Sequence, residues 1–396
     1  MTNDIILAGL GQTDVGEHWD IGLRDLAFAA IQDALHDAGG LKPQALYVGN
    51  MLAPNLSRQA HLGALLADFA GLRFDFAQHS AGIEAVTVEA AGASGGAALR
   101  QGYLAVKSGL VDVALVVGVE KMTDVVGAGV EEALATAADS DYESVQGLTP
   151  TAQAALLMQR YMHEHNVPAD GFAGFALTAH ANGAGNPHAM FRKAIKPEAY
   201  AKAEPLTPPL NMFDAAPNAD GAAALVLTRR ELLPSNWPHP LVKISASATA
   251  SDTLALHDRK DPLFFEAAYL ATGRAIKQAG ITLDQIDFFE YHDSYSIYAA
   301  LSLESSGFAI RGHGWKMAAD GRIARDGNLP CATLGGLKAR GFAGGATGVY
   351  QAAEAAAQLR SQAEACQVKD ARVGMIQSLG GPASTAVVHI LERIER

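Results

Sequence analysis

The sequence predicts an internally duplicated α/β protein, and two observations carry that prediction. The order β-α-β-α-β-β can be followed through residues 1–240 and again through residues 241–396. In each half a glycine turn opens a helix built of small residues. The 396 residues are 49% hydrophobic and 18% charged, a composition that fits a large globular core. We therefore expect two similar units that build one site between them.

The first strand and the first helix of each half match in pattern. Apolar runs at residues 5–9 and 242–246 predict strands. The helix that follows each run ends at an Ala-Gly pair, a common C-terminal signal, and strands are predicted next at 45–48 and 286–291. The inward faces of the two helices repeat at helical spacing. They consist of Phe28, Ile31, Leu35 and Ala38 in the first half, and of Ala268, Ala271, Ala275 and Ala279 in the second.

The glycine turns are the third feature that the halves share. Residues 92–96 and 344–348 each precede a helix in which Ala and Gly occupy most faces. Such helices pack closely, so we expect them to be buried between sheets. Each is followed by two more strands, at 111–118 and 222–227 in the first half and at 373–378 and 385–391 in the second.

The domain organisation follows from this duplication. The halves are predicted to span residues 1–240 and 241–396. Residues 129–212, rich in helix and loop, have no counterpart in the second half. We interpret this segment as an inserted cap that covers the site.

Charge and cysteine content exclude several classes of protein. The formal net charge is −12 without a run of Lys or Arg, so we expect no nucleic acid and no anionic membrane as a partner. The N-terminus has no basic region, and the apolar run after it is too short for a signal peptide. Cys331 and Cys366 lie far apart and show neither a disulfide pattern nor a metal-binding spacing. These features predict a cytoplasmic protein without a metal.

The first glycine turn allows more than one chemistry. Gly92-Ala93-Ser94-Gly95-Gly96 fits the pattern G-x-S-x-G, in which Ser94 would be a hydrolase nucleophile. The alternative is that small residues simply allow a tight turn, and an internal duplication argues against that hydrolase fold. A helix N-terminus also offers free N–H groups that stabilise an oxyanion.

A polar cluster follows the predicted strand at 286–291. His292, Asp293, Ser294 and Tyr295 place an imidazole beside a carboxylate and two hydroxyls, which suits acid–base catalysis. The alternative is a polar surface loop. Later in the chain, the turn at Gly380 and Gly381 is also able to present N–H groups.

These segments together resemble the thiolase superfamily, in particular the sterol-carrier-type and archaeal-type thiolases. The resemblance extends over nearly the whole chain and implies a fold of five layers, α/β/α/β/α. The matching segments are Gly118-Val119-Glu120-Lys121-Met122, His180-Ala181-Asn182 with Asn186-Pro187 and Arg192, Asp220-Gly221-Ala222, His292-Asp293-Ser294-Tyr295, Gly335-Gly336-Leu337-Lys338 and Gly345-Ala346-Thr347-Gly348.

The departures from the family pattern concern the catalytic residues. Gly92 stands where the family carries its nucleophilic Cys, and Phe342 stands where a G-H-P box supplies the His that activates it. Ser294 replaces the acid–base Cys of sterol-carrier-type members, and Ala332 replaces an expected Asn. Two losses in one mechanism suggest that covalent catalysis was abandoned. Cys331 and Ser94 remain the substitute nucleophiles to consider.

The rest of the family's machinery is present. The resemblance implies that His292 binds an oxyanion, and that the N–H of Gly92 with that of Gly380 or Gly381 forms a second oxyanion site. Ser294, Phe342 and Cys331 would then contact substrate. It also implies coenzyme A thioesters as ligands without a covalently bound cofactor, contacted mainly through the inserted segment.

We therefore expect an acetyl-CoA acetyltransferase-like protein that handles acyl-CoA without ordinary thiolysis. Carbon–carbon bond chemistry such as retro-aldol cleavage needs only a polarised carbonyl and a base, for which His292, Asp293 and Tyr295 are the candidates. The alternative is a non-catalytic acyl-CoA-binding or scaffold subunit. The resemblance further implies a homodimer and allows a partner protein with an OB-fold and a zinc ribbon.

Overall fold

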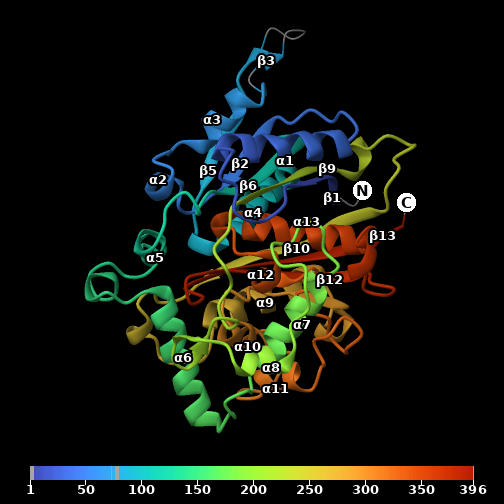
Figure 1. Cartoon of the computed structure of the whole chain (residues 1–396). Coiled ribbons are helices and arrows are strands. Elements are labelled where there is room, and N and C mark those ends of the chain that lie inside the picture. The colour runs from blue at the N-terminus through green and yellow to red at the C-terminus, as the bar shows by residue number, and fades with distance from the viewer. Residues whose placement is uncertain (1–3, 73, 76–79, 396) are drawn as a thin grey trace.

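The computed structural model describes residues 4–72, 74–75 and 80–395. Figure 1 shows sheets and helices alternating in layers from the N-terminal half to the C-terminal half. The predicted duplicated α/β arrangement is confirmed. The first three residues of the N-terminus lie outside the described part.

The first half contributes five strands in the order β5-β2-β6-β9-β1. Strand β2 is parallel to β5 and β6, while β9 is antiparallel to β6 and β1. The short exposed strand β5 was missed by the sequence analysis, because its five residues form no apolar run. The strands are β1 (Ile5–Gln12), β2 (Ala45–Gly49), β5 (Glu84–Val88), β6 (Val113–Glu120) and β9 (Gly221–Arg229).

The second half repeats this order as β10-β13-β12-β11. A parallel bridge between Cys331 and Phe289 lies beside β11, where β5 lies beside β2 in the first half. The two sheets join at the pair Ile6 and Lys243 of β1 and β10. The strands are β10 (Leu241–Ser251), β11 (Phe288–Glu290), β12 (Val373–Gly380) and β13 (Thr385–Ile394).

The layers follow from which helices contact which strands. Helix α1 (Leu23–Asp37) packs on the outer face of the first sheet, and α9 (Glu266–Ala279) packs on that of the second. Helices α4 (Ser94–Ser108) and α13 (Thr347–Leu359) lie between the sheets, each in contact with strands of both halves. This arrangement gives the five layers α/β/α/β/α.

The remaining elements extend from this body. The helices α6, α7 and α8 of the inserted segment lie beside the second half in Figure 1, with α6 against α10 and α7 against α11 and α12. The bounds are α2 (Ala53–Leu56), α3 (Leu62–Phe69), β3 (Phe74–Asp75), β4 (Ser80–Ala81), α5 (Ala128–Ala135), α6 (Pro150–His165), α7 (Ala173–Gly183), α8 (Pro197–Ala201), β7 (Pro205–Thr207), β8 (Leu210–Asn211), α10 (Ser296–Ser305), α11 (Gly314–Ala319) and α12 (Gly336–Arg340). The domain boundary near residue 240 remains a prediction, and it falls between β9 and β10.

Within the described residues, no helix is both long and apolar enough to cross a lipid bilayer.

The two central helices approach each other backbone to backbone. A Cβ atom on Gly348 would lie 2.2 Å from the backbone N of Gly96. A Cβ atom on Gly95 would lie 2.7 Å from the carbonyl oxygen of Gly345. Only glycine fits at this crossing, because either contact is far inside the van der Waals distance.

We expect Gly348→Ala to lower the free energy of unfolding by about 1–3 kcal/mol, as overpacking of a close-packed core does. The matched control is Gly273→Ala in α9, where an added Cβ would meet no atom within 4 Å. That control should stabilise the protein by up to about 1 kcal/mol, because alanine is the better helix former. Urea unfolding measures both changes, and equal effects of the two substitutions would contradict the packing argument.

Candidate active site

A cavity of about 580 Å³ opens between the two glycine-headed halves and the inserted segment, and its lining is mostly apolar. Six of the residues singled out from the sequence line it: Gly92, Ser294, Tyr295, His292, Phe342 and Gly381. Asp293, Cys331 and Gly380 are not among the lining residues that the structure describes. Residues singled out from both halves of the sequence therefore meet at one cavity, and their catalytic and binding roles remain predictions.

Gly92 lies in the single turn (Ala91–Ala93) that leads into α4. A Cβ atom at this position would lie 2.8 Å from the carbonyl oxygen of Leu379 and 3.2 Å from Cε1 of His292. Strand β12 has thus brought its carbonyl into the space that a nucleophilic side chain would need. The site therefore not only lacks a sulfur atom at position 92 but also leaves no room for a side chain there.

Ser94 has a structural role instead of a nucleophilic one. Its side chain is fully buried, and its hydroxyl donates to the carbonyl oxygen of Ala91 at 2.6 Å. The same hydroxyl accepts a hydrogen bond from the backbone N–H of Ala90 at 2.9 Å. Both bonds hold the turn before α4, so the structure argues against a hydrolase that uses Ser94.

His292 follows β11 and turns the Cε1–Nε2 edge of its ring toward Gly92. Burial, with a smaller contribution from Arg340, lowers the pKa of His292 to about 3. The imidazole is therefore neutral at physiological pH. Nδ1 is buried without a hydrogen-bond partner among the described residues. We place the proton on Nε2, since an N–H at Nδ1 would have no acceptor.

Phe342 occupies the place of an activating base with an aromatic ring. Its ring stands edge-on to that of His292, with 5.8 Å between centroids. Its backbone is fixed, because its N–H donates to Pro217 O at 2.8 Å and its carbonyl accepts from Ala219 N at 3.0 Å. A phenyl ring cannot accept a proton, so it contributes only an apolar wall.

Asp293 was predicted to be catalytic and Cys331 to contact substrate, but neither residue lines the cavity. The Asp293 carboxylate accepts from the N–H of Leu337 at 2.7 Å and holds the start of α12. Burial raises its pKa. The thiol of Cys331 is fully buried and donates to the carbonyl oxygen of Leu329 at 3.2 Å. Burial also raises the pKa of Cys331, which disfavours the reactive thiolate.

Lys338, Glu131 and Thr151 line the cavity but were not singled out from the sequence. The amine of Lys338 donates to the carbonyl oxygen of Asp214 at 2.6 Å, and burial lowers its pKa to about 8. The Gly-Gly-Leu-Lys segment contained the signal for Lys338. Glu131 and Thr151 lie in the inserted segment, in which no motif marked either residue.

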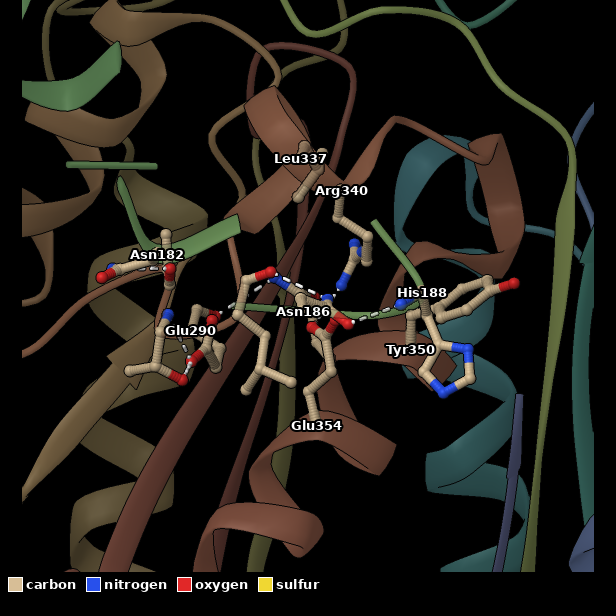
Figure 2. A network of polar contacts seen from close by, with 12 residues as sticks. Asn182, Asn186, His188, Glu290, Leu337, Arg340, Tyr350 and Glu354 are labelled. Atoms are coloured by element: carbon tan, nitrogen blue, oxygen red, sulfur yellow. Dashed lines mark hydrogen bonds and ion pairs between the residues drawn. The ribbon is translucent and has the colours of Figure 1, made fainter. Parts of the chain in front are cut away.

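A polar network supports α12 and the loop before it, as Figure 2 shows. Arg340 donates to Glu354 at 2.5 Å, with both side chains buried, and its guanidinium lies 5.2 Å from the ring centroid of Tyr350. Asn182 and Asn186 of the inserted segment donate to backbone carbonyls of the 331–334 loop at 3.0 and 2.9 Å. The inserted segment and the second half are therefore tied together beside the cavity.

The described residues contain no group of three or more His, Cys, Asp and Glu side chains placed to hold a metal ion.

Two family models match the chain. "Thiolase, N-terminal domain" matches residues 5–206, and "Thiolase C-terminal domain-like" matches residues 248–393. An "Acetyl-CoA acetyltransferase" of Methanothermobacter thermautotrophicus is 41% identical and aligns with 98% of this chain and 100% of its own length.

More distant relatives have other names. A "17-hydroxy-3-oxo-4-pregnene-20-carboxyl-CoA lyase" of Mycobacterium tuberculosis is 26% identical over 91% of this chain and 92% of its own. The solved structure "Ltp2-ChsH2(DUF35) aldolase" superposes with a TM-score of 0.82 at 23% identity, covering 100% of this chain and 99% of that one. That likeness shows a shared fold. Taken together, the family models and the relatives place this chain in the thiolase superfamily.

Proposed function

We propose that this protein cleaves a carbon–carbon bond of a β-hydroxyacyl-CoA by a retro-aldol reaction, without an acyl-enzyme intermediate. The observation that carries this proposal is the pairing of Gly92 with His292. The Cε1–Nε2 edge of His292 faces the position that a Cβ atom on Gly92 would occupy, and the carbonyl oxygen of Leu379 lies 2.8 Å from that position. Such a site suits a polarised carbonyl that is not attacked by the protein.

The reaction needs a group that stabilises negative charge on the thioester oxygen. In a retro-aldol step the Cα–Cβ bond breaks, its electron pair passes into the thioester as an enolate, and the β-hydroxyl loses its proton to form a carbonyl. A neutral imidazole donates a hydrogen bond from Nε2 to the enolate oxygen and stabilises its negative charge, while the ring itself stays neutral. The low pKa of His292 supports this role, since the ring stays neutral throughout the physiological range.

The reaction also needs a group near the β-hydroxyl. Tyr295 lines the same cavity as His292, and its hydroxyl lies 2.9 Å from Oγ of Thr151. Asp293 instead holds α12, so we assign it the positioning of His292 and the 337 turn. Ser294 and Phe342 are proposed to contact the acyl group as lining residues.

Coenzyme A is the proposed carrier of the acyl group. The names of the relatives include acetyl-CoA acetyltransferases and a CoA lyase. The apolar cavity lined from the inserted segment suits an acyl chain with a bulky apolar substituent at Cβ. A partner that delivers acyl-CoA, such as an OB-fold and zinc-ribbon protein, is part of the proposal, since one fold neighbour is named as a complex with a DUF35 protein.

Two assays test the activity. With acetoacetyl-CoA and free CoA we expect no turnover at ordinary thiolase rates, since no nucleophile is available. With 3-hydroxy-3-phenylpropionyl-CoA we expect cleavage to benzaldehyde and acetyl-CoA. The absorbance of benzaldehyde measures the rate. His292→Ala should lower kcat about 10²- to 10³-fold, as loss of an oxyanion donor does. His163→Ala, an exposed histidine on α6, is the matched control and should leave kcat unchanged.

Three outcomes would contradict the proposal. Rapid thiolysis of acetoacetyl-CoA, or an acyl adduct detected on any side chain by mass spectrometry, would show covalent chemistry. If neither substrate reacts, and His292→Ala leaves the activity of a co-purified assembly unchanged, the chain is better described as a non-catalytic acyl-CoA-binding subunit.

A homodimer is the proposed oligomeric state. Strand β5 forms one end of the nine-stranded sheet, so its outer edge has no strand partner among the described residues. Val86 on this strand and Leu104 on the neighbouring α4 are 44% and 40% exposed. Free strand edges beside apolar side chains favour pairing with a second chain.

Light scattering after size-exclusion chromatography tests this state. We expect a dimer for the natural protein and a shift to monomer for Val86→Lys combined with Leu104→Glu, because both charges would be buried against the second chain. Ile310→Lys is the control, since Ile310 is 78% exposed and lies in the second half, away from β5. A monomeric natural protein would contradict the prediction.

A further inference from the structure

Three side chains from separate segments form a hydrogen-bonded chain along one wall of the cavity. The hydroxyl of Tyr295 lies 2.9 Å from Oγ of Thr151. That Oγ in turn lies 3.4 Å from both carboxylate oxygens of Glu131. All three residues line the cavity that also contains His292 and Gly92. A path for a proton therefore runs from the cavity wall to a carboxylate.

The hydroxyl of Thr151 is available for this path because the side chain of another residue, Thr149, caps the start of the helix. Thr151 is the second residue of α6, and Thr149 already caps that helix by accepting from the N–H of Ala152 at 3.2 Å. Threonine within a helix commonly bonds a carbonyl of its own helix. Here the Thr151 side chain instead bridges Tyr295, which precedes α10, and Glu131 on α5.

Glu131 is an unusual side chain for a mostly apolar cavity. Among the described residues, burial and the hydrogen bond from Thr151 are the influences that act on its carboxylate, and no cation is among them. Burial raises the pKa of Glu131 above the ordinary glutamate value, and the bond from Thr151 lowers it by less. Glu131 is half-buried, and a cavity carboxylate whose pKa is raised in this way is a candidate functional group.

We propose that Glu131 is the proton reservoir of the site, linked to the substrate through Thr151 and Tyr295. The inference rests on the retro-aldol activity proposed above. The neutral tyrosine cannot itself hold an extra proton, so it needs a group to which its own proton can pass. The chain to Glu131 supplies that group.

The proton transfers balance. The β-hydroxyl of the substrate gives its proton to the oxygen of Tyr295, the tyrosine gives its own to Thr151, and the threonine gives its own to Glu131. As the Cα–Cβ bond breaks, a neutral aldehyde or ketone forms together with the enolate of the shortened acyl-CoA. The protonated Glu131 then returns one proton along the same path to Cα of the enolate. No oxidant, reductant or further reactant is needed.

The charges around this chain are few. The charge of Glu131 contributes to the raised pKa of Tyr295. The pKa of the nearby Tyr298 is affected by Tyr295, Arg259 and Glu143. Helices α2 and α6 pack against α5. The four residues of α2 carry no charge, and in the first turns of α6 the polar groups are threonine and glutamine. His180 and His292 line the same cavity, and burial lowers their pKa values to about 4 and about 3. A limb above the ordinary glutamate pKa that disappears in Glu131→Gln is therefore the one assigned to Glu131.

The experiment uses the full chain and 3-hydroxy-3-phenylpropionyl-CoA as the probe. We expect Glu131→Gln and Thr151→Val to lower kcat about 10²- to 10⁴-fold, the usual contribution of acid–base catalysis, with KM changed little. Thr151→Ser keeps the hydroxyl and should retain most of the activity. Glu132→Gln, exposed on the same helix, is the matched control and should behave like the natural protein.

The pH profile separates a proton relay from a structural role. For the natural protein kcat should fall at low pH with a midpoint above that of an ordinary glutamate, since Glu131 must be ionised to accept the proton. The residual activity of Glu131→Gln should lack this limb. Thermal melting checks that each variant is folded.

The outcomes distinguish this inference from the proposed function. Cleavage by the natural protein together with unchanged kcat and pH profile in folded Glu131→Gln and Thr151→Val would overturn the relay and leave the retro-aldol activity standing. Absence of cleavage by the natural protein would overturn both. Loss of activity in Thr151→Val without rescue in Thr151→Ser would also contradict the relay.

Discussion

The close approach of α4 and α13 is the constraint on which the rest of the structure depends. The helices meet at glycines, with Gly348 and Gly96 too close to admit a single Cβ atom. This contact locks the two sheets at one separation. It also brings the turn before α4 next to the end of β12, so that Gly92, Leu379 and His292 meet on a buried part of the cavity wall. A packing requirement of the core therefore sets the geometry of the site.

Within that geometry the proposed chemistry depends on two missing groups, a nucleophile and its activating base, and on one retained group, His292. Gly92 has no side chain that could form a thioester bond, and the carbonyl oxygen of Leu379 would lie only 2.8 Å from an added Cβ atom. Phe342, whose ring packs against His292, cannot take a proton. His292 remains, buried and neutral, and is suited to donate a hydrogen bond to an oxygen that gains charge. Both losses remove groups needed only for covalent catalysis, whereas the retained His292 can act without a covalent intermediate. Non-covalent chemistry therefore explains the site better than a thiolase that has merely lost its activity.

The inserted segment adds a carboxylate and a hydroxyl to the cavity wall. Glu131 and Thr151 lie on its helices and meet Tyr295 from the second half. Asn182 and Asn186 tie the same segment to the loop that leads into α12. The two halves supply Gly92 and His292 to the cavity, while the inserted segment supplies Glu131 and Thr151 of the proposed proton path.

The sequence by itself determined the duplication, the glycine turns and the substitutions at Gly92 and Phe342, because periodicity and short motifs are local properties of a chain. It missed β5, whose five residues are half-exposed and form no apolar run. Only the tertiary structure decided that Cys331 faces away from the cavity and that Glu131 faces into it. Which way a side chain points depends on the packing of segments that are distant in sequence, and no local pattern records that packing.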